Sequence, residues 1–585
     1  MSSRAKASPR KPKAAREASK QSKDLPTSTV LRLAGRAAAF LIVAGLASPV
    51  SQLSLSPVYG SIPASLHHQR AITVTAALAF IGRGGLKKIL PSRVEDYIAV
   101  IAYWTPVIQF LLFQYSGQLG IEYGPLIIEA LTYLPLLFLC CYTAGDLLDS
   151  LDPAQFRLPP AVAEAVLPIA SYATVSSVSK IAGAILPLYV GTHVWFTRIG
   201  FQTLIGSITA ILSPSRVILL AFPAILHTLY ANPHYAGSDS ALQRANATLY
   251  ASTNFTLLAR HESITGYVSV LENDADNAFR LMRCDHSLLG GEWMVTPAAY
   301  ARGQRQREPI FSVFVLLEAI RLVLPPTSQP TIPDSEKSAL VIGLGAGTAP
   351  NALISHNITT TIVELDPVVH HFASKYFDLS PNHHAVLADA VQYVADESLA
   401  RPSSYNYIIH DVFTGGAEPV HLFTREFLSG LKRLLKDDGV VAINYAGDLS
   451  LPSTRLVLNT IHAVFPRCRL YRDSPRAEDW TPEKPDFINM VVFCVKRSPP
   501  GAAKEDVIRF REPTEEDFGG SIARRNFLAP REELEIRFEY LAEERGGKVM
   551  GRAEVGELER WHRRGAVSHW RIMREVLPAG VWEMW

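Results

Sequence analysis

Long apolar runs with few charges between them mark the first half of the chain. These runs lie near 33–50, 71–82, 97–115, 124–145, 161–178, 181–196 and 201–231. A helix needs roughly 20 apolar residues to cross the hydrocarbon core of a membrane, and the runs at 97–115 and 124–145 meet that length. We therefore expect residues 26–235 to form a transmembrane helical domain of six to eight spans, rather than a soluble bundle of buried helices.

The distribution of charged residues sets off a short N-terminal segment from the apolar half of the chain. Residues 1–25 hold eight Lys or Arg and two acids, which predicts a disordered basic arm, with a mitochondrial transit peptide as the alternative. Together with Arg32 and Arg36, this arm predicts a cytosolic N-terminus, because Lys and Arg collect on the cytosolic side of membrane proteins. Within the apolar half, Glu129 is a candidate functional residue because an acid inside a membrane span is costly.

Beyond residue 235 the pattern is that of a globular α/β protein. Residues 264–282 predict two strands around a polar turn, and apolar residues recur at helical spacing over 309–324. We expect a β-hairpin domain with a linking helix at 236–325 and a Rossmann-like catalytic domain at 326–500. A charged C-terminal tail follows at 501–585, with a helix over 532–545.

Glycines follow the strand at 339–342 in close succession. Gly343, Gly345 and Gly347 stand between this strand and a helix, as in the opening unit of a nucleotide-binding doubly wound sheet. Glycine allows a sharp turn and a close approach of the backbone to a ligand. Glu364 ends the next strand about 20 residues later, where an acid can accept hydrogen bonds from a ribose diol. The dinucleotide pattern G-x-G-x-x-G is not met, because position 348 is Thr348.

The G-x-G-x-G form resembles motif I of the S-adenosylmethionine-dependent Rossmann transferases. In that class an acid at the end of the third strand lies beside the adenine, and here Asp389, followed by Ala390, matches it. An acid at the end of the fourth strand faces the reaction centre, and Asp411 matches that position. The resemblance implies that S-adenosylmethionine or its decarboxylated form is a co-substrate, with no metal.

Residues 260–497 are more closely similar to the spermidine/spermine synthase family, and the whole chain resembles a membrane-fused member. YNYIIHD at 405–411, followed by EPVHLFTREF at 418–427, resembles that family's motif, and a hairpin domain precedes the core in both. The resemblance implies transfer of an aminopropyl group from decarboxylated S-adenosylmethionine to a small-molecule amine. Asp411 would be the general base. A homodimer is a possible assembly in this family.

The acceptor side departs from the family pattern. The family's second acid is replaced by Thr414, and its Asp-Glu-x-x-Tyr element retains only Glu308. Asp285 matches a strand-end acid that faces the acceptor, so Asp285, Glu308 and Thr414 are the expected substrate-binding positions. A buried ammonium without an acidic partner is costly. S-adenosylmethionine-dependent methyl transfer is therefore the alternative function, and a membrane-anchored nucleotide sensor without turnover is a further one.

Net charge, cysteines, one histidine and three glycosylation sequons add further expectations. The net charge of +2 argues against a nucleic-acid partner, and the five cysteines form neither a disulfide framework nor a zinc pattern. His410 precedes Asp411 on a strand, so its side chain points to the opposite face and a structural role is expected. Glycosylation sequons begin at Asn246, Asn254 and Asn357. They are interpreted as fortuitous, because the donor nucleotide predicts a cytosolic catalytic domain.

Overall fold

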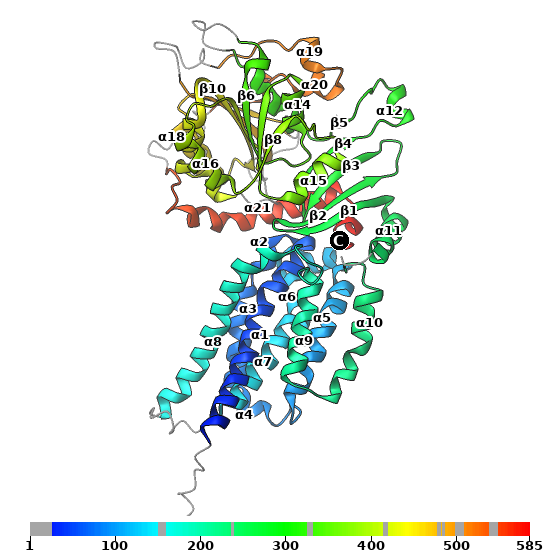
Figure 1. Ribbon diagram of the computed structural model, residues 1–585, viewed down its shortest axis with the longest axis vertical. Helices are drawn as coiled ribbons and strands as arrows, with labels where there is room; N and C mark the ends of the chain where they lie inside the picture. The colour runs from blue at the N-terminus through cyan, green and yellow to red at the C-terminus, as the bar shows by residue number, and fades with distance from the viewer. Residues whose placement is uncertain are drawn as a thin grey trace, which may run out of the picture.

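The molecule is elongated, with helices at one end and two β-sheets at the other (Figure 1). The computed structural model describes residues 26–149, 160–235, 239–324, 332–412, 419–476, 481, 486–497, 508–537 and 548–585. Residues 26–235 form the helical domain. Residues 255–585, referred to below as the catalytic unit, contain both sheets and the C-terminal helices.

The helical domain is a bundle whose long helices run along the long axis of the molecule (Figure 1). Among the described residues, three helical stretches are long and apolar enough to cross a membrane. A fourth is obtained if α6 and α7, bent by 44°, count as one span. The six to eight spans expected from the sequence therefore remain a prediction. The helices are α1 (Thr27–Tyr59), α2 (Ser61–Ser65), α3 (His68–Ile81), α4 (Arg83–Leu86), α5 (Ile98–Phe113), α6 (Ser116–Leu131), α7 (Tyr133–Asp149), α8 (Pro160–Ile185), α9 (Arg198–Leu212) and α10 (Phe222–Tyr230).

Glu129 lies in a buried polar network inside this bundle. Its Oε1 atom is 2.7 Å from Nδ1 of His68 and accepts a hydrogen bond from Ser51 at 2.8 Å. The other ring nitrogen of His68 contacts the hydroxyl of Ser48 at 2.7 Å. All four side chains are buried. Partners from two helices thus compensate the burial of this acid, and they fix the packing of α1 and α3 against α6.

A five-stranded antiparallel sheet follows the helical domain and an intervening helix, α11 (Asp239–Thr253). The predicted hairpin is confirmed as β2 (Gly266–Asn273) and β3 (Phe279–Cys284). The sheet is larger than expected because β1 (Phe255–Ser263) and β4 (Ser287–Trp293) flank the hairpin and β5 (Glu308–Pro309) extends it. The helix expected over 309–324 is present as α13 (Ser312–Leu317), continued by a 3₁₀ turn over Glu318–Leu322.

The Rossmann-like sheet has eight strands in the order β13-β11-β12-β10-β9-β6-β7-β8. Strands β6 to β10 pair in parallel, and two apolar clusters cover the two faces. The strand expected at 339–342 and the next strand, expected to end at Glu364, are confirmed as β6 and β7. The strands are β6 (Ser338–Ile342), β7 (Thr359–Glu364), β8 (His383–Leu387), β9 (Tyr405–His410), β10 (Leu435–Asp448), β11 (Cys468–Arg472), β12 (Phe487–Val495) and β13 (Glu535–Ile536), and the helices of the layers are α14 (Thr348–Ser355), α15 (Pro367–Tyr376), α16 (Ala390–Ala400), α17 (Arg425–Leu434) and α18 (Pro452–Val464).

The C-terminal segment packs back on the rest of the molecule. Helix α21 (Val555–Val576) runs between the Rossmann-like sheet and the helical domain (Figure 1), and α22 (Ala579–Glu583) follows it. The helix expected over 532–545 is wrong in its described part, where a 3₁₀ turn leads into β13. Pairing of β13 with β11 and the ion pair of Glu535 with Arg469 outweigh the helical preference of this charged stretch. Residues 538–545 lie outside the described residues.

A disulfide joins Cys468 of β11 to Cys494 of β12, which are directly paired across the two antiparallel strands. The other three cysteines are free. The spacing of the cysteines along the chain does not reveal this bridge, because the pairing depends on the register of two strands that meet only in the folded sheet.

Candidate active site

The predicted nucleotide-binding residues meet where the chain changes sides of the sheet. Strands β6 and β9 are neighbours, although β7 and β8 lie between them in the sequence. Ligands of open parallel sheets bind beyond the carboxyl ends of the strands at such a switch point. Gly343 follows β6 and Asp411 follows β9, and the backbone N–H of Asp411 donates to the carbonyl of Ile342 at 2.8 Å. The structure therefore brings the glycine turn and the expected base together.

At two of the three positions, 343 and 345, only glycine fits, because a side chain would collide with the backbone of a neighbouring strand. Gly343 has φ +85°, and a Cβ atom there would lie 2.1 Å from the carbonyl oxygen of Asp411. Gly345 has φ +53°, and a Cβ atom there would lie 2.3 Å from the carbonyl oxygen of Leu289 in β4. Gly347 precedes the first residue of α14. The glycine turn is thus held between the end of β9 and the hairpin sheet.

Glu364 lies beside the glycine turn, and Asp389 lies at the start of a helix. The carboxylate of Glu364 accepts hydrogen bonds from the backbone N–H groups of Leu344 and Asp366, at 3.0 and 2.8 Å. Burial raises the pKa of Glu364 to about 7, against the effect of these N–H donors. Asp389 is exposed, and it accepts from the N–H of Val391 at 2.7 Å and so caps α16. Ala390 is the first residue of α16, and the nucleotide contacts of these three residues remain predictions.

Two exposed leucines flank these acids. Leu365 is 46% exposed and follows Glu364, whereas Leu387 is 53% exposed and pairs with Glu364 across β7 and β8. Exposed apolar side chains next to acceptors at strand ends fit a nucleoside, whose base is apolar on its faces and whose ribose carries hydroxyl donors. The sequence interpretation missed the leucines because apolar residues in strands are ordinarily assigned to the core.

Asp411 is partly buried and bound by a residue that the sequence interpretation missed. Nδ2 of Asn444, in β10, donates to Oδ1 of Asp411 at 2.8 Å. Burial raises the pKa of Asp411 to about 6, and the hydrogen bond from Asn444 opposes this rise. Oδ1 of Asn444 is buried and has no partner among the described residues. A polar amide within the apolar run VVAIN at 440–444 is the signal that identifies this position in the sequence.

The predicted structural role of His410 is confirmed. Its ring points to the face opposite Asp411, where it packs edge-on against Phe423, with ring centres 4.9 Å apart. Nε2 of His410 lies 3.1 Å from the carbonyl oxygen of Leu422. Burial lowers the pKa of His410 to about 4, so the ring is neutral near pH 7.

The structure gives two of the three expected acceptor residues other partners. Asp285 accepts hydrogen bonds from Arg198 of the helical domain at 3.1 Å and from the backbone N–H of Tyr267 at 2.8 Å. Glu308 accepts from the hydroxyl of Ser521 and from backbone N–H groups at the start of α20 (Ile522–Phe527). Both carboxylates are engaged in packing contacts, and their role in binding the acceptor stays a prediction. Thr414 lies outside the described residues.

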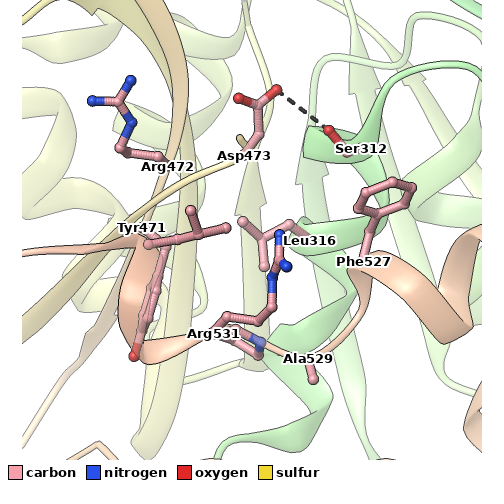
Figure 2. A pocket seen from close by; sticks show the side chains of 10 residues that line it. Ser312, Leu316, Tyr471, Arg472, Asp473, Phe527, Ala529 and Arg531 are labelled. Atoms are coloured by element: carbon pink, nitrogen blue, oxygen red, sulfur yellow. Dashed lines mark hydrogen bonds between the residues drawn. The ribbon is translucent and has the colours of Figure 1, made fainter. Parts of the chain in front are cut away.

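A separate pocket lies on the same face of the sheet as Asp411 and Asn444. Asn444 pairs with Val491 of β12, which pairs with Tyr471 of β11. Neighbouring strands are about 4.8 Å apart, so Tyr471 lies about 10 Å from Asn444. Figure 2 shows Asp473 above this tyrosine, 3.4 Å from the hydroxyl of Ser312. The pocket is lined by Ser312, Leu316, Tyr471, Arg472, Asp473, Phe527, Ala529, Pro530, Arg531 and Leu534.

The described residues include no group of three or more His, Cys, Asp or Glu side chains placed to hold a metal ion. The absence of a metal from the reaction stays an expectation.

Comparison with known proteins identifies the family. Residues 324–472 match the spermine/spermidine synthase domain. An N-terminal histidine N-methyltransferase of Emericella nidulans is 43% identical over 555 residues, which cover 94% of this chain and 97% of that enzyme. The chain belongs to the same family as this histidine methyltransferase.

More distant matches cover less of the chain. A polyamine aminopropyltransferase of Vibrio vulnificus is 41% identical over 112 residues, which cover 18% of this chain and 36% of that enzyme. A crystal structure of a probable spermidine synthase from Corynebacterium glutamicum is 16% identical, has a TM-score of 0.36, and covers 50% of this chain and 94% of that one.

The family membership decides several predictions. The chain is a transferase of the S-adenosylmethionine-dependent class with a Rossmann-like fold, which confirms the predicted enzyme class and co-substrate. Of the two chemistries expected from the sequence, the similarity favours methyl transfer over aminopropyl transfer. Kinship with the synthases is confirmed only for the domain over 324–472.

Proposed function

We propose that this protein transfers a methyl group from S-adenosylmethionine to a nitrogen of a histidine at the N-terminus of another protein. The similarity to the histidine methyltransferase of Emericella nidulans over 94% of the chain supports this proposal. The aminopropyltransferase of Vibrio vulnificus matches only 18% of the chain. The wider match includes the helical domain and the C-terminal segment, whereas the narrower one is restricted to part of the chain.

The reaction is a displacement at carbon. The attacking nitrogen forms a bond to the methyl carbon of the donor, the bond from that carbon to the sulfonium sulfur breaks, and S-adenosylhomocysteine leaves. The nitrogen must present a lone pair, so a proton has to pass to a base before or during the attack. Asp411, with its pKa raised to about 6, is mostly ionised near pH 7 and accepts a proton more readily than an ordinary aspartate.

Asp411 and Asn444 together present acceptors for N–H groups. Because the carboxylate accepts hydrogen bonds, the amide nitrogen of Asn444 faces it, and the amide oxygen is left without a partner. A histidine at a chain terminus carries N–H donors on its amine and on its ring. Hydrogen bonds to these two acceptors would orient the histidine and leave one nitrogen lone pair directed at the methyl group.

The pocket in Figure 2 is a small hollow beside which an acceptor longer than one residue could extend. It lies about 10 Å from Asn444 by strand spacing, on the same face of the sheet. An extended chain rises about 3.3 Å per residue, so the pocket is about three residues away from the reacting histidine. We infer that a peptide runs from Asp411 toward Asp473 and Arg531.

The direct test uses the full chain purified in detergent. It is incubated with S-adenosylmethionine and a peptide that begins with histidine, and S-adenosylhomocysteine and the peptide mass are measured. The expected result is one added methyl group on the first residue, with no product from the same peptide preceded by alanine. Equal methylation of both peptides would contradict N-terminal recognition. Methylthioadenosine formed from decarboxylated S-adenosylmethionine and putrescine would instead establish aminopropyl transfer.

Variants separate the chemistry from the fold. Asp411→Asn is expected to lose methyl transfer while still binding the donor, whereas Asp437→Asn, at an exposed ion pair with Lys496 and Arg497, serves as the matched control. Asp473→Asn is expected to raise the KM for the peptide without changing the KM for the donor. An unchanged peptide KM would exclude the pocket in Figure 2 from the peptide path.

We also propose that residues 26–235 form a membrane domain. Buried polar side chains lie inside the bundle, whereas outward-facing residues such as Ile81, Ile211 and Leu219 are 84%, 76% and 72% exposed. A bundle with a polar interior and apolar outer surface suits a lipid surrounding. The chain is then expected to stay in the membrane pellet after alkaline carbonate extraction, and its release would contradict the proposal.

A further inference from the structure

Helix α1 links two opposite ends of the molecule. Near its start, Arg36 pairs with Glu95 at 3.2 Å and donates to the last residue of α9 at 3.3 Å. At its other end, the carbonyl of Val58 accepts from Nε1 of Trp570 in α21 at 3.0 Å, and Tyr59 stacks on the same ring. Figure 1 shows α4 at the end far from the catalytic unit. The 33 residues of α1 thus reach from that end to the catalytic unit.

Most of the described cations of the helical domain lie at the end far from the catalytic unit. Ion pairs join the ends of α4 and α7 there, through Arg83 with Asp149 and Lys87 with Asp146. The described cations at this end are Arg32, Arg36, Arg83, Lys87, Lys88, Arg93 and Arg216. The eight Lys and Arg of residues 1–25 precede α1 at the same end of the helix.

The end of the helical domain that faces the catalytic unit has fewer Lys and Arg than the far end. Its connecting segments at 60–67, 114–115, 190–197 and 231–235 contain no Lys or Arg. Arg198, which begins α9 at this end, is buried in ion pairs with Glu262 and Asp285. Two exposed cations, Arg70 in the first turn of α3 and Lys180 near the end of α8, lie toward this end, against seven described cations at the other. Lys and Arg in short loops mark the cytosolic side of a membrane protein. The end with the N-terminal arm is therefore the cytosolic one.

We propose that the catalytic unit lies on the non-cytosolic side of the membrane and that Asn254 and Asn357 are N-linked glycosylation sites there. This inference rests on the proposed membrane domain and not on the proposed reaction. It departs from the expectation of a cytosolic catalytic domain, which rested on where the donor nucleotide is expected. The donor then has to reach the non-cytosolic side.

The disulfide between Cys468 and Cys494 supports this placement independently. Disulfides form and persist in oxidising compartments and are rare in the cytosol. The pair lies in the catalytic unit, on adjacent strands of the Rossmann-like sheet. Cys140 and Cys141, in the helical domain, are buried and remain free thiols.

The three sequons differ in accessibility. Asn254 and Asn357 are exposed, and both lie at turns with φ near +60° that precede a strand. Asn246 is partly buried, and its side-chain amide makes two hydrogen bonds with the backbone of Leu257. A glycan is attached through the amide nitrogen at an accessible position. Asn254 and Asn357 therefore meet the requirement, and Asn246 does not.

The test expresses the full chain in a eukaryotic cell and follows its gel mobility before and after enzymatic removal of N-glycans. Asn254→Asp and Asn357→Asp are each expected to remove one glycan, and aspartate is chosen because it tolerates the left-handed backbone of these turns. Thr248→Ala removes the third sequon, leaves the bonds of Asn246 in place and is expected to change nothing. Absence of glycans from Asn254 and Asn357 would overturn the assignment of these sites.

A glycosylation sequon placed in the N-terminal arm tests the opposite orientation, in which the arm is non-cytosolic and the catalytic unit cytosolic. Lys20→Asn creates the sequon Asn-Gln-Ser over residues 20–22 of the N-terminal arm. No glycan is expected there, and a glycan on this variant would overturn the orientation. Protease added to intact microsomes is expected to remove a tag on the arm and to spare the catalytic unit, and digestion of the catalytic unit would also overturn it. Release of the chain by alkaline carbonate would instead contradict the proposal that residues 26–235 form a membrane domain.

Discussion

The sharpest prediction concerns the hydrogen bond from Asn444 to Asp411. Replacing Asn444 with leucine, which has nearly the same shape, removes the N–H donor that opposes the effect of burial on the carboxylate. A hydrogen bond to a charged group contributes about 1.5 to 3 kcal/mol. Since 1.36 kcal/mol corresponds to one pH unit, the pKa of Asp411 is expected to rise by about 1 to 2 pH units, from about 6 to about 7 to 8.

The direction of the effect on rate follows from the role of the base. Asp411 accepts a proton only when ionised, so the rate is present above its pKa and is lost as the pH falls through it. At pH 7 about nine-tenths of the wild-type carboxyl groups are ionised, against roughly one-tenth to one-half in Asn444→Leu. Ionisation alone is therefore expected to lower the methyl transfer rate at pH 7 roughly 2- to 10-fold, and this part of the loss is expected to disappear near pH 9, whereas loss of the substrate contact to Oδ1 of Asn444 would persist at every pH.

The assay is the pH profile of kcat for methyl transfer to a histidine-first peptide, measured for wild type, Asn444→Leu and Asn382→Leu. Asn382 is exposed and serves as the matched control. The predicted result is an acidic limb displaced to higher pH in Asn444→Leu alone. An unmoved acidic limb would refute the reasoning, because it would show that the hydrogen bond from Asn444 does not set the pKa of Asp411.

Three further variants test the other site residues. Gly345→Ala places a Cβ atom against the carbonyl of Leu289, so it is expected to lower Tm and donor affinity in calorimetry, whereas Gly556→Ala, in open space within a helix, is expected to leave both unchanged. Because the pKa of Glu364 is raised from 4.5 to about 7, wild-type stability is expected to fall as the pH rises between these values, and Glu364→Gln is expected to flatten that fall in a thermal melt. Glu308→Gln is expected to lower the free energy of unfolding by about 1 to 3 kcal/mol and to leave the peptide KM unchanged, and a raised KM would support a role of Glu308 in binding the acceptor.

The donor side of the site could be predicted from the sequence because its signals are local. The turn at 343–347 and the acids Glu364 and Asp411 each follow their own strand, and parallel strands align their carboxyl ends at one edge. Periodicity therefore places these residues together without knowledge of the packing. The hydrogen bonds of Glu364 to backbone N–H groups on two segments, by contrast, depend on how the strands pack.

The acceptor side could not be predicted in the same way. Asn444 reaches Asp411 only because β10 pairs with β9 in a register that sets Ile443 beside His410. Asp285 lies in the expected hairpin, but an arginine of the helical domain binds it, and this contact joins parts of the chain that are 87 residues apart. No local pattern encodes such a contact, so it could not be predicted from the sequence.

The division between the two sides explains how a synthase-like core would serve the proposed methyl transfer. The matched domain over 324–472 contains the glycine turn, Glu364 and Asp411, all at the switch point where the donor is expected. Aminopropyl and methyl transfer share the adenosine, the sulfonium and the need for a proton acceptor. They differ in the acceptor, and here its described surroundings are an uncharged amide, Asn444, and a separate pocket about 10 Å away. A histidine at a peptide terminus would use N–H acceptors at the reaction centre, which is what the carboxylate of Asp411 and the unpartnered amide oxygen of Asn444 offer.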